Sequence, residues 1–216
     1  MADGMQAAPV LFTHRVEPED QARADFYALL ARLFRAAPDA GLLAAIAAAD
    51  ELQVAPGSEH GDALASAWRV LVTASSIMDA GAAKEEYQAL FIGVGQSEIS
   101  LHGAAYAKAA SGGPLLVQVR EALAKLELTR QASTTVYEDH LAVLFETMRV
   151  LILGTGRAQP LAIEDQCDFF CANIAPWATD CCTAICAKGV ANYYVRVAQF
   201  TSFFVAVERD SFAIER

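Results

Sequence analysis

Ionisable side chains and an apolar stripe lie together in residues 135–148, which read TVYEDHLAVLFETM. Thr135 and Glu138 have the spacing of a capping box, in which a hydroxyl and a carboxylate each satisfy a backbone N–H of the first helical turn. The pattern predicts a helix that starts near residue 138 and presents Asp139 and His140 at its N-terminal end. Behind them, apolar residues recur with the period of one helix face, at Leu141, Leu144, Phe145, Met148, Leu151 and Ile152.

The two adjacent carboxylates of this segment could bind an arginine of a partner protein. A carboxylate pairs with a guanidinium through charge-assisted and often bidentate hydrogen bonds, so Glu138 and Asp139 would select for basic segments. The alternative is that both side chains only cap the helix and complement its dipole. His140 is expected to be neutral beside the helix N-terminus, where it could donate to a partner, titrate near neutral pH or serve only as an internal hydrogen bonder.

A second candidate surface comes from residues 83–92, where Tyr87, Leu90 and Phe91 share one helix face. Together with nearby carboxylates, these side chains could line an apolar groove that accepts an amphipathic segment. Ordinary core packing is the alternative for Leu90 and Phe91, because large apolar residues are usually buried.

All five cysteines fall between residues 167 and 186, and two pairs, Cys167/Cys171 and Cys182/Cys186, are spaced four apart. Four thiolates could hold zinc or an iron–sulfur centre. The C-x-x-C spacing is absent, however, and the first pair lies on an apolar stripe, so we favour core packing and assign no metal ligand. An odd number of cysteines also argues against a disulfide framework. A cysteine-based metal-binding or metal-carrier protein of the same helical fold is the alternative function.

Composition narrows the classes of function. The formal net charge of −10 argues against nucleic-acid binding, which needs clustered lysine and arginine. No long uncharged apolar stretch is present, so no membrane insertion is expected. Residues 1–13 lack the basic start of a signal peptide, and we expect a cytoplasmic protein. Motifs of nucleophilic hydrolases, phosphate-binding loops and dinucleotide-binding enzymes are absent as well, so an enzyme is not expected.

Helical periodicity runs through nearly every segment, and no two-residue hairpin signal separates alternating stretches. We therefore predict an all-α fold, a single globular bundle-like domain of about eight or nine helices over residues 17–210. Residues 1–16 are expected to form a flexible N-terminal extension. Five glycines make residues 93–114 the most loop-like part of the chain, with one short helix expected around residues 104–109.

Three motifs, in this order along the chain, resemble the TorD/DmsD/NarJ family of redox-enzyme maturation chaperones. The first is Glu86-Tyr87-Gln88-Ala89-Leu90-Phe91-Ile92-Gly93, similar to the family's E-Y-x-x-L-F-x-G. The second is Glu138-Asp139-His140-Leu141, similar to its acidic D-H-L helix start. The third runs from Phe169-Phe170 through Pro176-Trp177 to Tyr193-Tyr194, similar to its F-F…P-W…F-Y ending. The resemblance covers residues 20–208.

The resemblance implies a cytoplasmic all-helical chaperone that binds the apo catalytic subunit of a molybdopterin oxidoreductase. Family members often hold the twin-arginine signal peptide of that subunit and assist cofactor insertion before export or assembly. The chain would act as a monomer or a domain-swapped dimer and need no cofactor; contact with guanine nucleotide or the molybdopterin cofactor is implied by the family alone. The residues implied to bind the partner peptide are Tyr87, Leu90, Phe91, His102, Glu138, Asp139 and His140, whereas Gly93, Pro176 and Trp177 are assigned to structure.

Two segments depart from the family pattern. The loop after Gly93 is usually proline-rich, with an aromatic and an acidic residue, whereas residues 94–103 here read VGQSEISLHG. The histidine that usually precedes the P-W pair is replaced within Asn173-Ile174-Ala175. The first departure leaves the identity of the client enzyme open, and a cytoplasmic oxidoreductase without a twin-arginine signal is one alternative.

Overall fold

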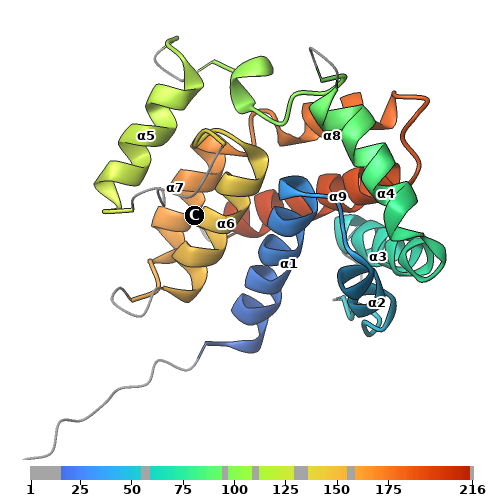
Figure 1. Ribbon diagram of the computed structural model, residues 1–216. Coiled ribbons are helices and arrows are strands. Elements are labelled where there is room, and N and C mark those ends of the chain that lie inside the picture. The colour runs from blue at the N-terminus through green and yellow to red at the C-terminus, as the bar shows by residue number, and fades with distance from the viewer. Residues whose placement is uncertain are drawn as a thin grey trace, which may run out of the picture.

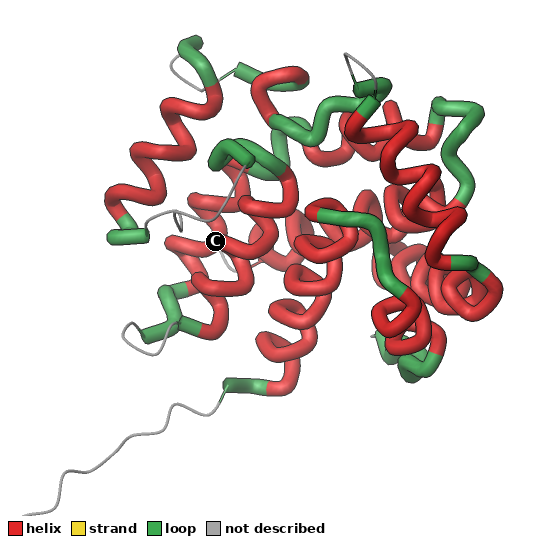
Figure 2. Tube along the Cα trace, in the orientation of Figure 1, coloured by secondary structure: helices red, strands yellow, loops and turns green. Residues whose placement is uncertain are grey.

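Helices dominate the described part of the chain, where no strand occurs (Figures 1 and 2). The computed structural model describes residues 16–54, 59–93, 97–108, 112–128, 136–154 and 159–214. An all-α fold is therefore confirmed. The α-helices of these ranges are α1 (Pro18–Arg35), α2 (Ala40–Ala47), α3 (Glu59–Ile77), α4 (Ala80–Tyr87), α5 (Leu115–Lys125), α6 (Leu141–Leu153), α7 (Ile163–Asn173), α8 (Ala178–Cys186) and α9 (Tyr193–Ile214).

Local capping chemistry explains several helix starts. Pro18 begins α1 without the loss of a hydrogen bond, because the N–H that proline lacks would have no intrahelical acceptor in the first turn. The acidic residues Glu19 and Asp20 follow it at the positive end of the helix dipole. The carboxylates of Asp39 and Asp79 each accept a backbone N–H at the starts of α2 and α4. In contrast, Pro176 lies exposed in the turn that separates α7 from α8.

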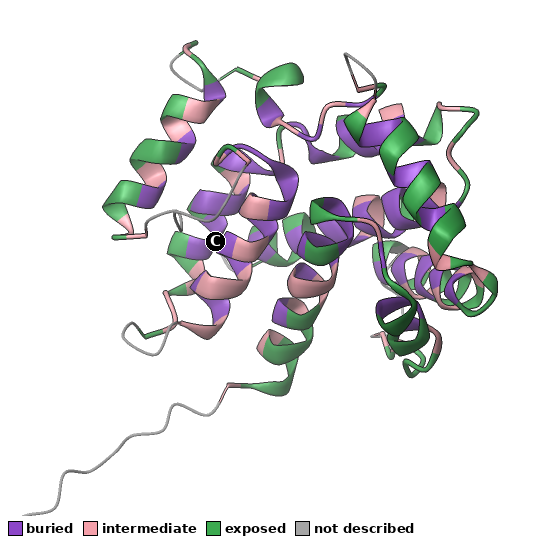
Figure 3. Cartoon of the chain, viewed as in Figure 1, coloured by how far each residue is buried: buried purple, intermediate pink, exposed green. Residues whose placement is uncertain are grey.

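The core forms around α9, which crosses the middle of the molecule between α3 on one side and α7 on the other (Figure 1). Helix α1 packs along α6, and α8 also packs on α9. Phe26 of α1 meets Trp68, Phe200 and Phe204 edge to face, with ring centroids 5.2–5.7 Å apart. Each of these helices contributes buried residues to one core cluster, and Figure 3 shows buried and exposed residues alternating along the helices.

Irregular backbone occupies the predicted loop-rich segment between α4 and α5. Helix α4 continues into a π-helical turn, Gln88–Ile92, which ends at Gly93 with the positive φ of 62° that favours glycine. The helix expected around residues 104–109 is only a 3₁₀ turn, Gly103–Ala105. An isolated bridge between His102 and His140 ties this segment to the start of α6, and a second bridge, Lys108 with Pro114, lies within the segment.

Among the helices within the described ranges, none combines the length and the apolar character that a membrane span requires. Of the predicted N-terminal extension, only Val16 lies within the described residues. At the other end, α9 reaches Ile214, beyond the expected domain limit at residue 210.

Candidate functional site

Asp139 is the centre of a buried cluster that joins the loop at residues 100–104 to the start of α6. Its Oδ1 accepts a hydrogen bond from His102 Nδ1 at 2.9 Å, and its Oδ2 accepts the backbone N–H of Ala104 at 3.1 Å. Burial alone would raise the pKa of the Asp139 carboxyl, but the hydrogen bonds from His102 and Ala104 outweigh burial and hold the pKa below its usual value. The carboxylate is therefore ionised at neutral pH and already has partners inside the protein.

Backbone hydrogen bonds pair the same two segments. The N–H of Gly103 donates to the Asp139 carbonyl at 2.9 Å, and the N–H of Leu141 donates to the carbonyl of residue 101 at 2.8 Å. The rings of His102 and His140 meet edge to face, with centroids 5.0 Å apart. Three of the residues predicted to bind a partner peptide thus lie together at one point of the fold.

His140 is the N-cap of α6. Its Nδ1 accepts the N–H of Ala142 at 3.1 Å, which places the imidazole proton on Nε2. Burial, followed by the positive charges of His102 and Arg35, lowers the pKa of His140 to about 4. The expectation of a neutral ring is met, but the ring does not titrate near neutral pH.

Glu138 lies in the turn before α6, which begins at Leu141, so the predicted capping box is wrong at this residue. Its expected partner, Thr135, lies outside the described residues. The Glu138 carboxylate instead pairs with Arg120 of α5 at 3.1 Å, and the Glu138 side chain is only 13% exposed. An arginine from a partner protein would have to displace Arg120 to reach it.

The Glu86 carboxylate caps α9 from across the molecule. It accepts the backbone N–H groups of Asn192, Tyr193 and Tyr194 at 2.8–2.9 Å. These donors belong to the first turn of a helix, where no intrahelical acceptor exists. No local signal indicates this role, because 106 residues separate Glu86 from Asn192.

Tyr87, Leu90 and Phe91 face the core and not an open groove. The Tyr87 hydroxyl donates to the carbonyls of Phe34 and Arg35 at the C-terminal end of α1. Leu90 has no exposed surface, and Phe91 is 9% exposed. In this conformation the three side chains offer a partner almost no surface, and their contact with a peptide stays a prediction.

Trp177 packs against the loop beside Asp139, at Gly103 and Tyr106. Its buried indole N–H donates to the Asn173 carbonyl at 2.7 Å, and its ring stacks on Tyr106. A Cβ at Gly103 would lie 2.8 Å from the Trp177 ring and 2.5 Å from Leu115, which is closer than side chains pack. Glycine at residue 103 is therefore required by this close approach.

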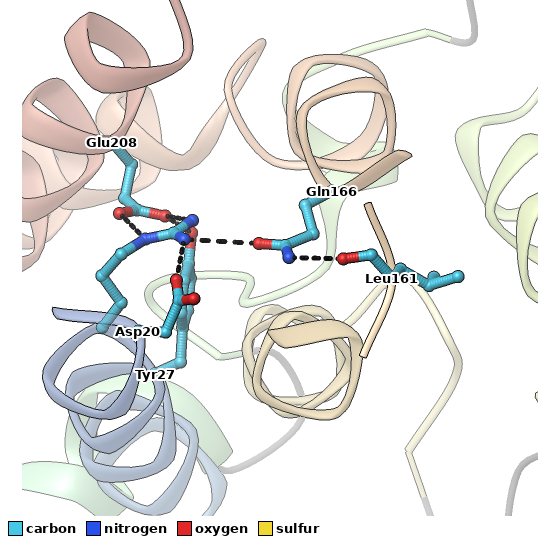
Figure 4. A network of polar contacts seen from close by, with 6 residues as sticks. Asp20, Tyr27, Leu161, Gln166 and Glu208 are labelled. Atoms are coloured by element: carbon cyan, nitrogen blue, oxygen red, sulfur yellow. Dashed lines mark hydrogen bonds and ion pairs between the residues drawn. The ribbon is translucent and has the colours of Figure 1, made fainter. Parts of the chain in front are cut away.

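A second polar cluster links α1, α7 and α9 (Figure 4). The Arg23 guanidinium donates to both carboxylate oxygens of Glu208, at 2.8 and 2.9 Å, and also to Asp20. Glu208 is 2% exposed and accepts a further hydrogen bond from the hydroxyl of Tyr27. Burial would lower the pKa of Arg23, but the hydrogen bonds and charge of Glu208 raise it overall. The Arg23 guanidinium therefore keeps its charge within the interior.

An acidic groove lies beside this cluster, between the N-terminal ends of α1 and α7 and the C-terminal end of α9. Its volume is about 790 Å³. Exposed carboxylates at its edge are those of Glu17 and Glu19, with Asp20 half-exposed. The apolar part of its wall consists of Val16, Ile152, Pro160, Leu161, Ala162, Ile163 and Phe212. The acidic groove therefore combines accessible negative charge with apolar surface.

Three of the five cysteines, Cys167, Cys181 and Cys182, are buried in the core, whereas Cys171 is half-buried and Cys186 is exposed. Burial raises the pKa of the Cys181 thiol to about 12 and that of Cys182 well above its usual value, so both are protonated at neutral pH. The sulfurs of Cys167 and Cys171 lie 3.7 Å apart. Among the described residues, no group of three or more histidine, cysteine, aspartate or glutamate side chains could hold a metal ion. Protonated thiols are poor metal ligands, and the geometry gives the metal-carrier alternative no support.

Comparison with protein families adds to this geometry. The family model described as nitrate reductase delta subunit matches residues 59–183, more than half of the chain. The matched region runs from α3 into α8 and includes Glu86 and the Asp139 cluster. A comparison with curated proteins finds no match. The chain therefore belongs to the nitrate reductase delta subunit family, a family of maturation chaperones for molybdenum enzymes.

Proposed function

We propose that the chain binds the apo catalytic subunit of a molybdopterin oxidoreductase and assists insertion of its cofactor before export or assembly. The family match over residues 59–183 carries this proposal. The chain works by reversible binding, needs no cofactor of its own and is not an enzyme. Its place of action is the cytoplasm, where the client subunit is loaded.

The bound part of the client is its N-terminal segment, basic at the start and apolar beyond it, as in a twin-arginine signal peptide. The acidic groove supports this choice, because Glu17, Glu19 and Asp20 offer carboxylates beside an apolar wall. Carboxylates give selectivity for arginine, and burial of apolar surface supplies most of the affinity. The net charge of −10 also attracts a basic segment over longer distances.

The residues predicted to touch the peptide contribute in two ways. The side chain of His102 is 34% exposed and remains a contact residue in this proposal. Glu138 remains one as well, with a client arginine replacing its partner Arg120. The others act indirectly, because they hold the loop at residues 97–108 and the π-helical turn in place. These interior residues are Tyr87, Leu90, Phe91, Asp139 and His140.

Purification of the tagged chain from its native cytoplasm tests the proposal. Under conditions in which molybdenum enzymes are made, a catalytic subunit of such an enzyme should copurify and be identified by mass spectrometry. The absence of any molybdenum-enzyme subunit under those conditions would contradict the proposal. Recovery of a subunit only when its N-terminal segment is present would in addition support the choice of that segment.

A further inference from the structure

A second groove lies between α3 and the N-terminal half of α9, and we call it the α3–α9 groove. Its volume is about 670 Å³. Helix α3 and the residue after it provide Ser66, Arg69, Val70, Thr73, Ala74, Ile77 and Met78, and the start of α9 with the residue before it provides Asn192, Tyr193 and Arg196. None of these residues belongs to the Asp139 cluster or to the acidic groove.

The charge of this groove is opposite to that of the whole chain. The protein has 26 acidic and 16 basic residues, yet residues 63–78 and 181–207 contain no aspartate or glutamate. Arg69 and Arg196 form no ion pair within the described ranges, whereas Arg23, Arg120 and Arg149 each have a carboxylate partner. Two guanidinium groups, one on each helix, are therefore available to an anionic partner.

Apolar side chains are exposed between these charges. Ile77 is 83% exposed and Val70 is 43% exposed, and both line the groove. Residues 66, 70, 73 and 77 follow the spacing of one helix face, so they form a strip along three turns of α3, on the order of 16 Å long. Exposed isoleucine and valine gathered in a groove favour burial against another surface.

We propose that the α3–α9 groove is a docking site for an acidic amphipathic helix of a partner protein. A helix fits because the strip on α3 is about three turns long and exposes Val70 and Ile77 beside the polar Ser66 and Thr73, as in other helix-in-groove interfaces. Its apolar face covers Val70 and Ile77, and carboxylates on its two flanks pair with Arg69 and Arg196. The acidic groove favours the opposite charge, so this interaction does not depend on which segment of the client binds there.

A pair of synthetic peptides tests the proposal on the full chain. One peptide is a helix of about 16 residues with leucines on one face and glutamates on both flanks of that face. The second peptide has the neutral glutamine in place of every glutamate, so the acidic groove does not attract it. By fluorescence polarisation at low salt, the glutamate peptide should bind at least about tenfold more tightly than the glutamine peptide. Equal affinities, or no binding of either peptide, would overturn the proposal.

Charge-reversal variants locate the interaction. Arg69→Glu with Arg196→Glu should lower the affinity for the glutamate peptide by about tenfold or more at low salt, with less effect at high salt. Ile77→Ser should lower that affinity at both salt concentrations, because it removes apolar contact. The control pair, Arg32→Glu with Lys125→Glu, makes the same change in net charge at exposed residues elsewhere.

The outcomes separate the groove from general electrostatics. Retained binding in the Arg69/Arg196 double variant, with its helicity confirmed by circular dichroism, would overturn the proposal. An equal loss of binding in the Arg32/Lys125 control would overturn it too, since net charge alone would then explain the result. Binding to vesicles of anionic phospholipid that Arg69→Glu with Arg196→Glu abolishes, without binding to the peptide, would reassign the groove to a membrane surface.

Discussion

The Nδ1 of His102 lies 2.9 Å from the Oδ1 of Asp139, and this contact joins the loop before α5 to the start of α6. The aspartate of the D-H-L motif is thus occupied by groups of the same chain. Its 2% exposure leaves no room for a client arginine in this conformation. The D-H-L motif therefore stabilises the fold, and it affects binding by holding the loop at residues 100–104 in position.

Asp139→Asn should lower the free energy of unfolding by about 2 kcal/mol, because a neutral amide accepts the hydrogen bonds of His102 and Ala104 less strongly than the buried carboxylate does. Urea denaturation followed by circular dichroism measures the change. A loss below about 0.5 kcal/mol, the level of ordinary surface changes, would contradict the structural role of Asp139. Replacing Asp139 and His140 together by alanine would remove the helix cap as well, so that variant tests folding before it tests binding.

Lowering the pH should destabilise the protein through His140. Its pKa is about 4 in the folded chain and 6.5 when unperturbed, so between these values the unfolded chain takes up a proton that the folded chain does not. The stabilisation is complete above pH 6.5, is lost as the pH falls toward 4, and amounts to on the order of 3 kcal/mol. The lowered pKa of Asp139 adds a further loss below its ordinary value of 3.8.

His140→Asn isolates this contribution, because asparagine caps a helix without titrating. Urea midpoints of the variant should depend less on pH between 6.5 and 4 than those of the wild-type chain. Parallel curves for the two proteins would show that His140 titrates alike in the folded and unfolded states, against the burial seen here.

Glu86→Gln should destabilise the chain by about 1–3 kcal/mol, since an amide group replaces one of the two oxygens that accept N–H donors of α9. Glu85→Gln is the matched control, because its exposed neighbouring side chain should change stability by less than about 0.5 kcal/mol. Chemical denaturation of both variants checks the difference. Equal stabilities would mean that Glu86 does not act as the cap.

Arg23→Met should cost about 3–5 kcal/mol of unfolding free energy, because it leaves the buried Glu208 carboxylate without its countercharge. Adding Glu208→Leu removes that unpaired charge and should restore much of the stability. A double-mutant cycle in urea measures this recovery. If the double variant loses as much unfolding free energy as the two single variants together, Arg23 and Glu208 are not energetically coupled, against their bidentate geometry.

Client binding should weaken when the carboxylates of the acidic groove are neutralised. The variant Glu17→Gln/Glu19→Gln/Asp20→Asn is expected to bind the client on the order of tenfold more weakly and to show less dependence on salt. The control neutralises three exposed carboxylates elsewhere, those of Glu51, Glu85 and Glu121. Binding titrations at two ionic strengths compare the variants, and equal affinity in all of them would exclude the acidic groove as the client site.

Helical periodicity in the sequence predicts the fold well, because it depends only on which residues are apolar. The stripes of α1 and α7 and the break at Pro176 follow from local spacing. The pairing of polar groups does not, since Arg23 meets Glu208 across 185 residues. The predicted start of α6 is wrong for a similar reason, because His140 provides the cap and Glu138 turns toward Arg120 on another helix.

The predicted peptide site shows the same limit. Tyr87, Leu90 and Phe91 share one face, and that spacing is equally typical of a groove and of a core. Only the positions of α1 and α9 decide between them, and those helices cover the face. Conversely, the acidic groove is formed by residues from both ends of the chain, so no local motif could indicate it.

The most direct test of the central claim compares the affinity of the chain for two forms of the copurified catalytic subunit, one without its molybdopterin cofactor and one loaded with it. Biolayer interferometry with the chain immobilised gives both affinities under the same conditions. A maturation chaperone should bind the apo subunit at least about tenfold more tightly and release it on loading. Equal affinity for the two forms, or binding to neither, would contradict the account.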